Sequence, residues 1–274
     1  MGNQLFQYAF AYATAKKLNT KFYIDKRLSN DIISRYFLLT EDRTSPLDRT
    51  LFAIKGFKNF FSSFLKLGFY SKLKKLLKLQ EIEFLNDVDP KIEMLKLNDR
   101  RLYAGFFQSE LYFIEYKKDI ILQFRLKKEA ISQFRKISFS LPQGFKLVVI
   151  HVRRTDYIDH DYTLPSAYFH QAIAKIQDPK NYYVIISDDR DFVNKEFDYL
   201  LNKYISNHNE IIDFQFLMNA NICILSNSSF SWWGAYLNTK KTMVIAPQYW
   251  LGQKHKTEQP LGIFIKGWEI ISVL

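Results

Sequence analysis

The stretch HVRRTDY (151–157) places two adjacent arginines between a histidine and an aspartate. A guanidinium keeps its charge at physiological pH and donates paired hydrogen bonds to phosphate oxygens. If the preceding strand persists, Arg153 and Arg154 point to opposite faces, so one can meet a ligand while the other braces the sheet. His151 and Asp156 then either orient the guanidinium or act in acid–base chemistry. The alternative is a surface arginine pair neutralised by Asp156.

A second polar stretch, SNSSFS (226–231), lies between an apolar run and an expected helix. Ser228 or Ser229 can cap that helix, its hydroxyl accepting a hydrogen bond from a backbone N–H. The remaining N–H groups and the helix dipole then favour a bound phosphate. The alternative is an ordinary N-cap with nothing bound. Trp232 and Trp233 fall inside the helix, where we expect core packing.

Carboxylates supply a third set of candidates. Asp213 precedes an expected helix, either as its N-cap or as an acceptor for the edge of a base or ribose. Three D-x-D triplets, a spacing that suits a divalent ion under a diphosphate, occur at Asp87/Asp89, Asp159/Asp161 and Asp189/Asp191. Because such triplets are frequent by chance, we expect none of the three to bind a metal. We also predict no cofactor.

These side chains need a scaffold of alternating strands and helices. Strands are predicted at 145–152, 181–189, 221–227 and 241–247, and helices at 165–176, 190–197, 213–220 and 229–238. This alternation predicts a parallel sheet with both faces covered, in which ligands bind at the carboxyl ends of the strands. The polar segments after the strands should therefore meet at one edge of the sheet.

The first half of the chain is less regular. We predict helices at 5–18 and 127–137, strands at 21–25, within 81–90 and at the start of 100–113, and an apolar, basic helix or helix pair at 51–80. The turn cluster LPQG (141–144) indicates a boundary between domains at 1–140 and 141–274.

Composition narrows the class of protein. The chain has 274 residues, is 47% hydrophobic and carries a net charge of +11, which favours anionic partners. Its one cysteine, Cys223, excludes a disulfide framework or thiolate cluster and should be a buried core residue. No apolar run of about 18 residues is present to span a bilayer. A nucleic-acid-binding protein is a remote alternative, because the aromatics fall at core-like spacing and no RNP or helix-turn-helix pattern occurs.

Four segments together resemble the bacterial α-1,2-fucosyltransferases of glycosyltransferase family 11. They are GNQLFQYAFAYATAKKL, GFFQSELYF, HVRRTDY and NSSFSWWGAYLN…VIAPQYW, in the family's order over nearly the whole chain. The resemblance implies an α/β, GT-B-like fold of two Rossmann-like domains facing a cleft, with an N-terminal acceptor-side domain and a C-terminal donor domain. It implies GDP-fucose as donor, a galactose-containing glycan as acceptor, inversion at the anomeric carbon and no required metal.

The resemblance also implies roles for single residues. Arg153 would bind the β-phosphate, with Arg154 more structural, and Ser228 and Ser229 would hold phosphate. The remaining donor-side residues are Asp188, Phe230 and Asp213, the last at the guanine edge. Asn3 and Gln4 would face the diphosphate or the acceptor. The general base is Asp156, Asp188 or no residue at all, and His151 is placed with Arg153 and Asp156 in the catalytic group.

The family opens with G-G-x-G-N-Q after a short apolar strand, whereas here Met1 directly precedes Gly2-Asn3-Gln4. This start implies that the first strand of the N-terminal sheet is missing from the sequence, and it leaves open an upstream start, a rearranged sheet or lost activity. Other readings are a different nucleotide-sugar transferase on the same fold and a truncated, inactive relative.

Location follows from the same features. We expect a cytoplasmic protein. The basic segment 51–80 either contacts an anionic membrane, where a lipid-linked glycan would be the acceptor, or forms a solvated lysine face.

Overall fold

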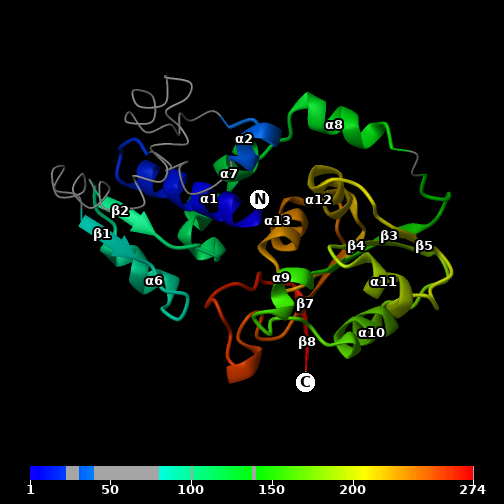
Figure 1. Ribbon diagram of the computed structural model, residues 1–274. Helices are drawn as coiled ribbons and strands as arrows, with labels where there is room; N and C mark the ends of the chain where they lie inside the picture. The colour runs from blue at the N-terminus through cyan, green and yellow to red at the C-terminus, as the bar shows by residue number, and fades with distance from the viewer. Residues whose placement is uncertain (23–30, 40–79, 100, 138–139, 274) are drawn as a thin grey trace, which may run out of the picture. The chain divides into compact units, whose positions relative to one another are not determined.

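The chain divides into two compact units (Figure 1). The computed structural model describes residues 1–22, 31–39, 80–99, 101–137 and 140–273. The C-terminal unit comprises Met1–Asn3 and Leu126–Leu274, and the N-terminal unit comprises Gln4–Arg125.

Helix α8 (Lys128–Arg135) belongs by its packing to the C-terminal unit. The Phe134 ring meets the Phe216 ring edge-on at 5.1 Å, and the Ala130 carbonyl accepts a hydrogen bond from the Gln215 amide at 2.9 Å. The units therefore part at Arg125, ahead of the turn cluster at 141–144 where the sequence analysis placed the boundary. The turn cluster at 141–144 indicates a loop. The unit to which the preceding helix α8 belongs is decided by the core on which that helix packs.

The C-terminal unit is built on a six-stranded parallel sheet. Its strands are β3 (Lys146–Val152), β4 (Asn181–Ser187), β5 (Lys203–Ile205), β6 (Ile222–Ile224), β7 (Met243–Pro247) and β8 (Glu269–Ile271). They lie in the order β5-β4-β3-β6-β7-β8, and every neighbouring pair is parallel. The chain thus winds outward from β3 in one direction and then from β6 in the other. In such doubly wound sheets the point of reversal is where ligands bind.

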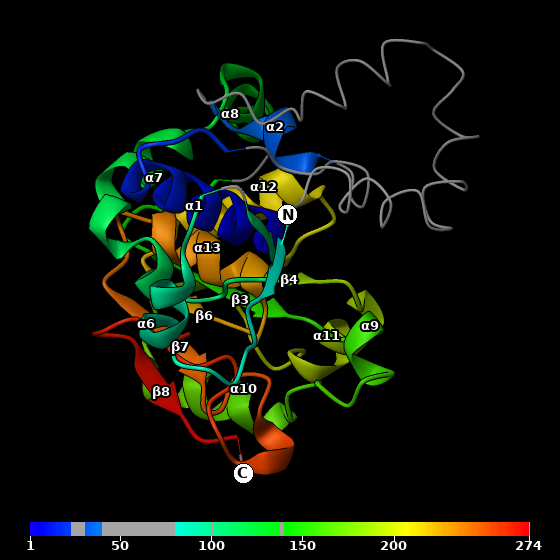
Figure 2. The same cartoon turned by 90° about the vertical axis from the view of Figure 1, so that its left-hand side faces the viewer.

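Helices cover both faces of this sheet (Figures 1 and 2). They are α10 (Ser166–Lys175), α11 (Arg190–Glu196), α12 (Glu210–Asn219) and α13 (Ser229–Leu237). Two short turns, α9 (Thr155–Ile158) and the 3-10 turn η6 (Gln253–His255), lie in the loops that follow β3 and β7. Val148, Ile150 and Val152 of β3 share an apolar cluster with Tyr168 and Phe169 of α10. Successive strand residues alternate in direction, so the intervening residues of β3 face α12 and α13.

The predicted alternation is confirmed for β3, β4, β6 and β7 and for the helices α10 to α13. Trp232, Trp233 and Cys223 are fully buried, as expected of core residues. Three elements were not predicted: β5, β8 and α9 are three or four residues long and contain no fully buried residue. Elements this short show no hydrophobic periodicity that can be recognised in the sequence.

The N-terminal unit contains a two-stranded parallel sheet and short helices. In the described part of this unit the elements are α1 (Gly2–Lys17, shared at its first two residues with the other unit), α2 (Ile32–Tyr36), β1 (Gln80–Glu83), α6 (Pro90–Glu93), η3 (Met94–Lys96), β2 (Arg101–Ala104), η4 (Glu110–Tyr112), η5 (Ile114–Tyr116) and α7 (Lys117–Gln123). Aromatic rings form its core. Phe10 of α1 stacks on Phe107 with centroids 3.8 Å apart and meets Phe84 and Tyr112 edge-on.

Two predictions fall outside the described residues. The expected strand at 21–25 extends into the undescribed 23–30, and the basic segment 51–80 lies in undescribed sequence up to residue 79. Within the described part of the chain, no helix combines the length and apolarity needed to cross a bilayer.

Candidate active site

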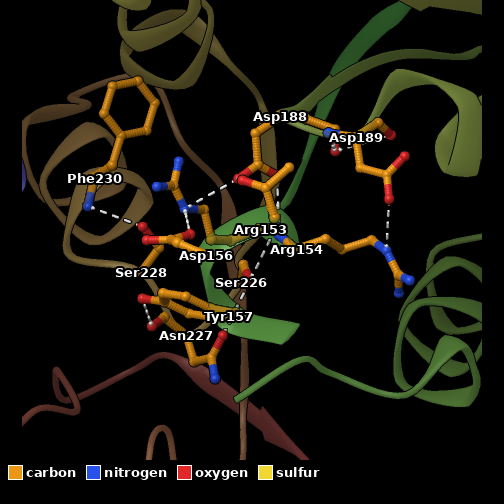
Figure 3. Close-up of polar contacts among 12 residues, drawn as sticks. Arg153, Arg154, Asp156, Tyr157, Asp188, Asp189, Ser226, Asn227, Ser228 and Phe230 are labelled. Atoms are coloured by element: carbon orange, nitrogen blue, oxygen red, sulfur yellow. Dashed lines mark hydrogen bonds and ion pairs between the residues drawn. The ribbon is translucent and has the colours of Figure 1, made fainter. Parts of the chain in front are cut away.

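The loops that follow β3 and β6 meet at the point where the sheet reverses (Figure 3). The Arg153 backbone N–H donates to the Ser226 hydroxyl at 3.3 Å, and the Tyr157 hydroxyl donates to the Asn227 carbonyl at 3.1 Å. The two stretches singled out in the sequence are therefore brought together, about 70 residues apart in the chain, because β3 and β6 are hydrogen-bonded neighbours.

The Arg153 side chain is oriented by two carboxylates that both contact its Nε. Asp156 Oδ1 lies 2.7 Å from Nε and Asp188 Oδ2 lies 3.2 Å from it. The terminal nitrogens of the guanidinium point away from these carboxylates (Figure 3). The hydrogen bond from Arg153 lowers the pKa of Asp156. Both carboxylates that the sequence offered as a general base are thus engaged in holding an arginine.

Asp188 also shapes the loop itself. Its Oδ1 accepts from the Arg154 backbone N–H at 2.9 Å, and its Oδ2 accepts from the Thr155 hydroxyl at 2.6 Å. One carboxylate at the end of β4 therefore fixes the turn after β3 and the arginine that projects from it.

Arg154 points away from Arg153 and braces the neighbouring helix. Its Nε pairs with Asp189 at 3.1 Å, and its guanidinium lies 3.7 Å from the centre of the Phe192 ring. The chain leaves the strand at Val152, yet the two arginines still diverge. These contacts favour the structural role for Arg154.

The D-x-D triplets have ordinary structural partners. Asp189 caps α11 by accepting from the Phe192 N–H at 3.0 Å, Asp89 caps α6, and Asp161 pairs with Lys254 at 3.1 Å. In the described ranges, no three His, Cys, Asp or Glu side chains are grouped as metal ligands.

The two serines after β6 have different partners. Ser228 is the N-cap of α13, and its hydroxyl accepts from the Phe230 N–H at 3.4 Å. Ser229, the first helical residue, donates its hydroxyl to Asn3 Oδ1 at 2.7 Å. Gly2 permits this approach, because a Cβ there would lie 2.4 Å from the Ser229 carbonyl carbon. The Gly-Asn pair near the start of the chain therefore packs directly on the serine turn.

Gln4, the next residue, belongs to the N-terminal unit, where its Oε1 accepts from the Ile32 backbone N–H at 3.1 Å. Its proposed part in acceptor or diphosphate binding stays a prediction.

His151 lies beneath the serine turn. It is 5% exposed, and its ring centre is 5.4 Å from that of Phe230. Burial lowers the pKa of His151 to about 3, with further lowering by Arg153, so the imidazole is neutral near pH 7. Its Nδ1 has no hydrogen-bond partner among the described residues. A neutral, enclosed imidazole supports Phe230 and the arginine loop and is a poor proton acceptor.

Asp213 is the fourth residue of α12 and does not cap it. The cap is Asn209, whose Oδ1 accepts from the Ile212 N–H at 3.2 Å, so the capping alternative for Asp213 was wrong. Instead Asp213 accepts from the Ser206 hydroxyl at 2.5 Å at the end of β5. Burial raises the pKa of Asp213 to about 6. The carboxylate is thus a largely desolvated acceptor beyond the carboxyl end of β5.

Three residues of this site were not predicted from the sequence. Ser226 and Tyr157 connect the two loops, and Ser206 holds Asp213. Tyr157 belonged to a stretch already singled out, but its aromatic ring gave no reason to separate it from core residues. Ser206 follows β5, a strand too short to be predicted, so its position at the sheet edge had no signal.

The sequence matches the profile of the glycosyl transferase family 11 over residues 1–272. The chain belongs to glycosyl transferase family 11. The curated relatives of this family 11 protein include two from Escherichia coli. The O-antigen biosynthesis glycosyltransferase WbnK is 27% identical over 97% of both chains, and an alpha-1,2-colitosyltransferase is 26% identical over 91% of this chain and 89% of its own.

Solved structures place the family 11 chain in the GT-B-like class. The fucosyltransferase NodZ from Bradyrhizobium has a TM-score of 0.53 and 13% identity, covering 89% of this chain and 90% of its own. Arabidopsis thaliana FUT1 in complex with GDP has a TM-score of 0.53 and 11% identity, covering 97% of this chain and 73% of its own. The protein is therefore a glycosyltransferase with a GT-B-like α/β fold, as the sequence segments predicted.

Proposed function

We propose that this glycosyltransferase moves fucose from GDP-fucose to a hydroxyl of a glycan, with O2 of a galactoside as the expected position. The observation that carries the proposal is the convergence of Arg153 and the Ser228–Ser229 turn at the reversal point of the sheet, joined by the hydrogen bond from Arg153 N to Ser226. A guanidinium and a helix N-terminus side by side form a site for a diphosphate. Two similar structures, NodZ soaked with GDP-fucose and FUT1 in complex with GDP, support this class of donor.

In the proposed reaction the acceptor oxygen forms a bond to the anomeric carbon as the bond from that carbon to the β-phosphate oxygen breaks. The electron pair leaves with GDP, the configuration inverts, and the acceptor hydroxyl releases its proton to solvent. Negative charge grows on the diphosphate, where Arg153 and the N–H groups at the start of α13 stabilise it. No metal enters this scheme. Asp156 and Asp188 hold Arg153, so we assign neither as the base.

Asp213 is proposed to accept hydrogen bonds from the guanine edge. It lies beyond the end of β5, at the carboxyl edge of the same sheet as Arg153. The N1–H and amino group of guanine are donors, so they require an ionised carboxylate, which the pKa of about 6 provides near neutral pH.

The decisive assay incubates the purified protein with GDP-fucose and a panel of β-galactosides, followed by mass spectrometry and linkage analysis of the products. We expect a single added deoxyhexose at O2, with the α configuration, and the same rate in EDTA. Transfer from UDP-sugars alone would overturn the donor assignment, and binding of GDP without transfer or hydrolysis would indicate an inactive relative.

A second candidate donor is GDP-colitose, because a relative 26% identical over 91% of this chain is an alpha-1,2-colitosyltransferase. Colitose is fucose without its 3-hydroxyl. A site that hydrogen-bonds that hydroxyl rejects the deoxy sugar by up to about 10⁴-fold, whereas one that ignores it accepts both within about tenfold. The ratio of kcat/KM for the two donors therefore assigns the natural one.

We further propose a lipid-linked glycan as acceptor, with peripheral binding to the cytoplasmic face of the membrane. An O-antigen biosynthesis glycosyltransferase 27% identical over 97% of this chain supports a glycan acceptor. The lysines of the segment 51–80 supply the charge for membrane binding. Co-sedimentation with vesicles containing acidic lipid tests this, and a protein that stays in the supernatant at low salt would contradict it.

A further inference from the structure

Tyr157 stands between the two halves of the proposed diphosphate site, and neither the motif nor the proposed reaction assigns it a role. It lies in α9, one turn beyond the arginine pair, and is mostly buried. The Arg153 guanidinium lies 5.9 Å from the centre of its ring. Its hydroxyl reaches the turn after β6 (Figure 3).

The Tyr157 hydroxyl is held in one direction. It donates its proton to the Asn227 carbonyl at 3.1 Å. A carbonyl can only accept, so the single phenolic proton is used in this bond. The next residue, Ser228, accepts from the Phe230 N–H at 3.4 Å through its hydroxyl and so caps α13. Tyr157 is therefore bonded to the residue that directly precedes the N-cap of α13.

The side chain of Asn227 anchors the turn that Tyr157 contacts. Its side-chain amide donates to the Tyr162 carbonyl at 2.7 Å and to the Trp250 carbonyl at 3.3 Å. Both Tyr249 and Trp250 have positive φ, at 64° and 54°, which is costly for aromatic residues. The turn after β6 is thus hydrogen-bonded to a segment whose unfavourable backbone conformation must be stabilised by the packing around it.

We propose that Tyr157 is a positioning residue, whose hydroxyl holds the Asn227–Ser228 turn in register with Arg153 so that both act on the same β-phosphate. This inference rests on the proposed diphosphate site. Burial raises the pKa of Tyr157 to about 12, so the hydroxyl remains a donor at working pH and does not serve as the base.

The test compares GDP with GMP, which lacks the β-phosphate. Tyr157→Phe keeps the ring under Arg153 and removes only the hydroxyl. We expect it to weaken GDP binding about tenfold and GMP binding less than about threefold, by calorimetry. The matched control is Tyr199→Phe, which also removes a hydrogen-bonded hydroxyl, 3.0 Å from His170 Nδ1, and should leave both affinities unchanged.

A double-variant cycle adds a readout that general loosening does not reproduce. Tyr157 bonds the Asn227 carbonyl and Ser228 caps α13, so Tyr157→Phe and Ser228→Ala each displace the same Asn227–Ser228 turn. The double variant should therefore lose about as much GDP affinity as the single variant that binds GDP more weakly. Independent effects would multiply to about a hundredfold. Wild-type GDP affinity in Tyr157→Phe, equal losses for GDP and GMP, or multiplying losses would each overturn the inference.

The same measurements separate this inference from the proposed function. A wild-type protein that binds neither nucleotide overturns both. A protein that binds GDP, shows the selective loss in Tyr157→Phe and transfers no fucose overturns the donor assignment while the positioning role stands.

Discussion

Asp188 contacts Arg153 at Nε, with 3.2 Å between Oδ2 and the nitrogen, and the terminal nitrogens of the guanidinium point elsewhere. Asp156 contacts the same Nε at 2.7 Å. Carboxylates that contact Nε fix the plane of the guanidinium group. Its terminal nitrogens stay available to donate two hydrogen bonds to an anion. This relationship makes Arg153 the centre of the proposed site.

Arg153→Ala should reduce the rate of transfer about 10²-fold, the cost of removing one preorganised group that stabilises charge in a transition state. GDP affinity should fall as well, because the guanidinium also meets the ground-state diphosphate. Steady-state kinetics with GDP-fucose and calorimetry with GDP measure the two effects.

Arg154→Ala is the matched control for this change. It removes an adjacent guanidinium that pairs with Asp189 and lies over Phe192. We expect a lower free energy of unfolding with GDP affinity largely retained. Equal losses of GDP affinity in the two variants would contradict the separate roles of the arginines.

Sequence periodicity was sufficient for the scaffold of the C-terminal unit. Long buried strands such as β3 and β4 are apolar along most of their length, and one polar segment follows each, so their shared edge could be predicted. The order of the strands could not, because β5 and β8 have three residues each and contain no fully buried residue. Because β5 was not predicted, nothing in the sequence placed Ser206 at the sheet edge beside Asp213. For the same reason Asp213 was considered as the N-cap of its helix, although Asn209 is the cap.

Residue types were less informative about roles within the site. By their residue type, Asp156 and Asp188 could each act as a base. In the structure, both carboxylates form ion pairs with Arg153. By its residue type, His151 could exchange a proton near neutral pH, but burial lowers the pKa of His151 to about 3 and keeps the imidazole neutral. Such roles depend on desolvation and neighbouring charge, which arise only after residues distant in the chain are packed together.

The two serines of the turn should differ in their effect on stability. Ser228→Ala removes the N-cap of α13 and should cost about 1 kcal/mol of unfolding free energy. Ser229→Ala should cost less, because alanine's better helix propensity at this first helical position offsets the lost hydrogen bond to Asn3. Urea denaturation measures both, and Ser228→Thr, which keeps a capping hydroxyl, is the control. A larger loss for Ser229→Ala would show that the cap is misassigned.

GDP binding should weaken on acidification because of Asp213. With its pKa raised to about 6, the carboxyl is mostly ionised at pH 7 and mostly protonated at pH 5. If only the carboxylate accepts from guanine, affinity should fall about tenfold over that interval. GDP's own phosphate titrates in the same range, so Asp213→Asn supplies the baseline. This variant should bind GDP more weakly at pH 7 and show the smaller pH dependence, and identical profiles for the two proteins would rule out Asp213 as a ligand.

Stability should respond to pH through His151 and Asp213 with opposite signs. The pKa of His151 falls from 6.5 to about 3 on folding, so between these values the unfolded chain binds more protons and acidification destabilises the fold. The pKa of Asp213 rises from 3.8 to about 6, so over that range the native state binds more protons and acidification stabilises it. Between about pH 4 and 6 the two contributions offset each other in the wild-type protein.

Removing either group should unmask the other. Relative to wild type, Asp213→Asn should lose stability more steeply as the pH falls from 6 to 4, by up to about 1.4 kcal/mol per pH unit. His151→Leu should shift the dependence the opposite way, whatever its absolute stability, because only the slope reports proton binding. Urea midpoints at several pH values give these slopes, with the remaining carboxylates common to all three proteins. Parallel curves for wild type and Asp213→Asn would mean that the Asp213 carboxyl titrates as it does in the unfolded chain, and that Ser206 and burial do not perturb it.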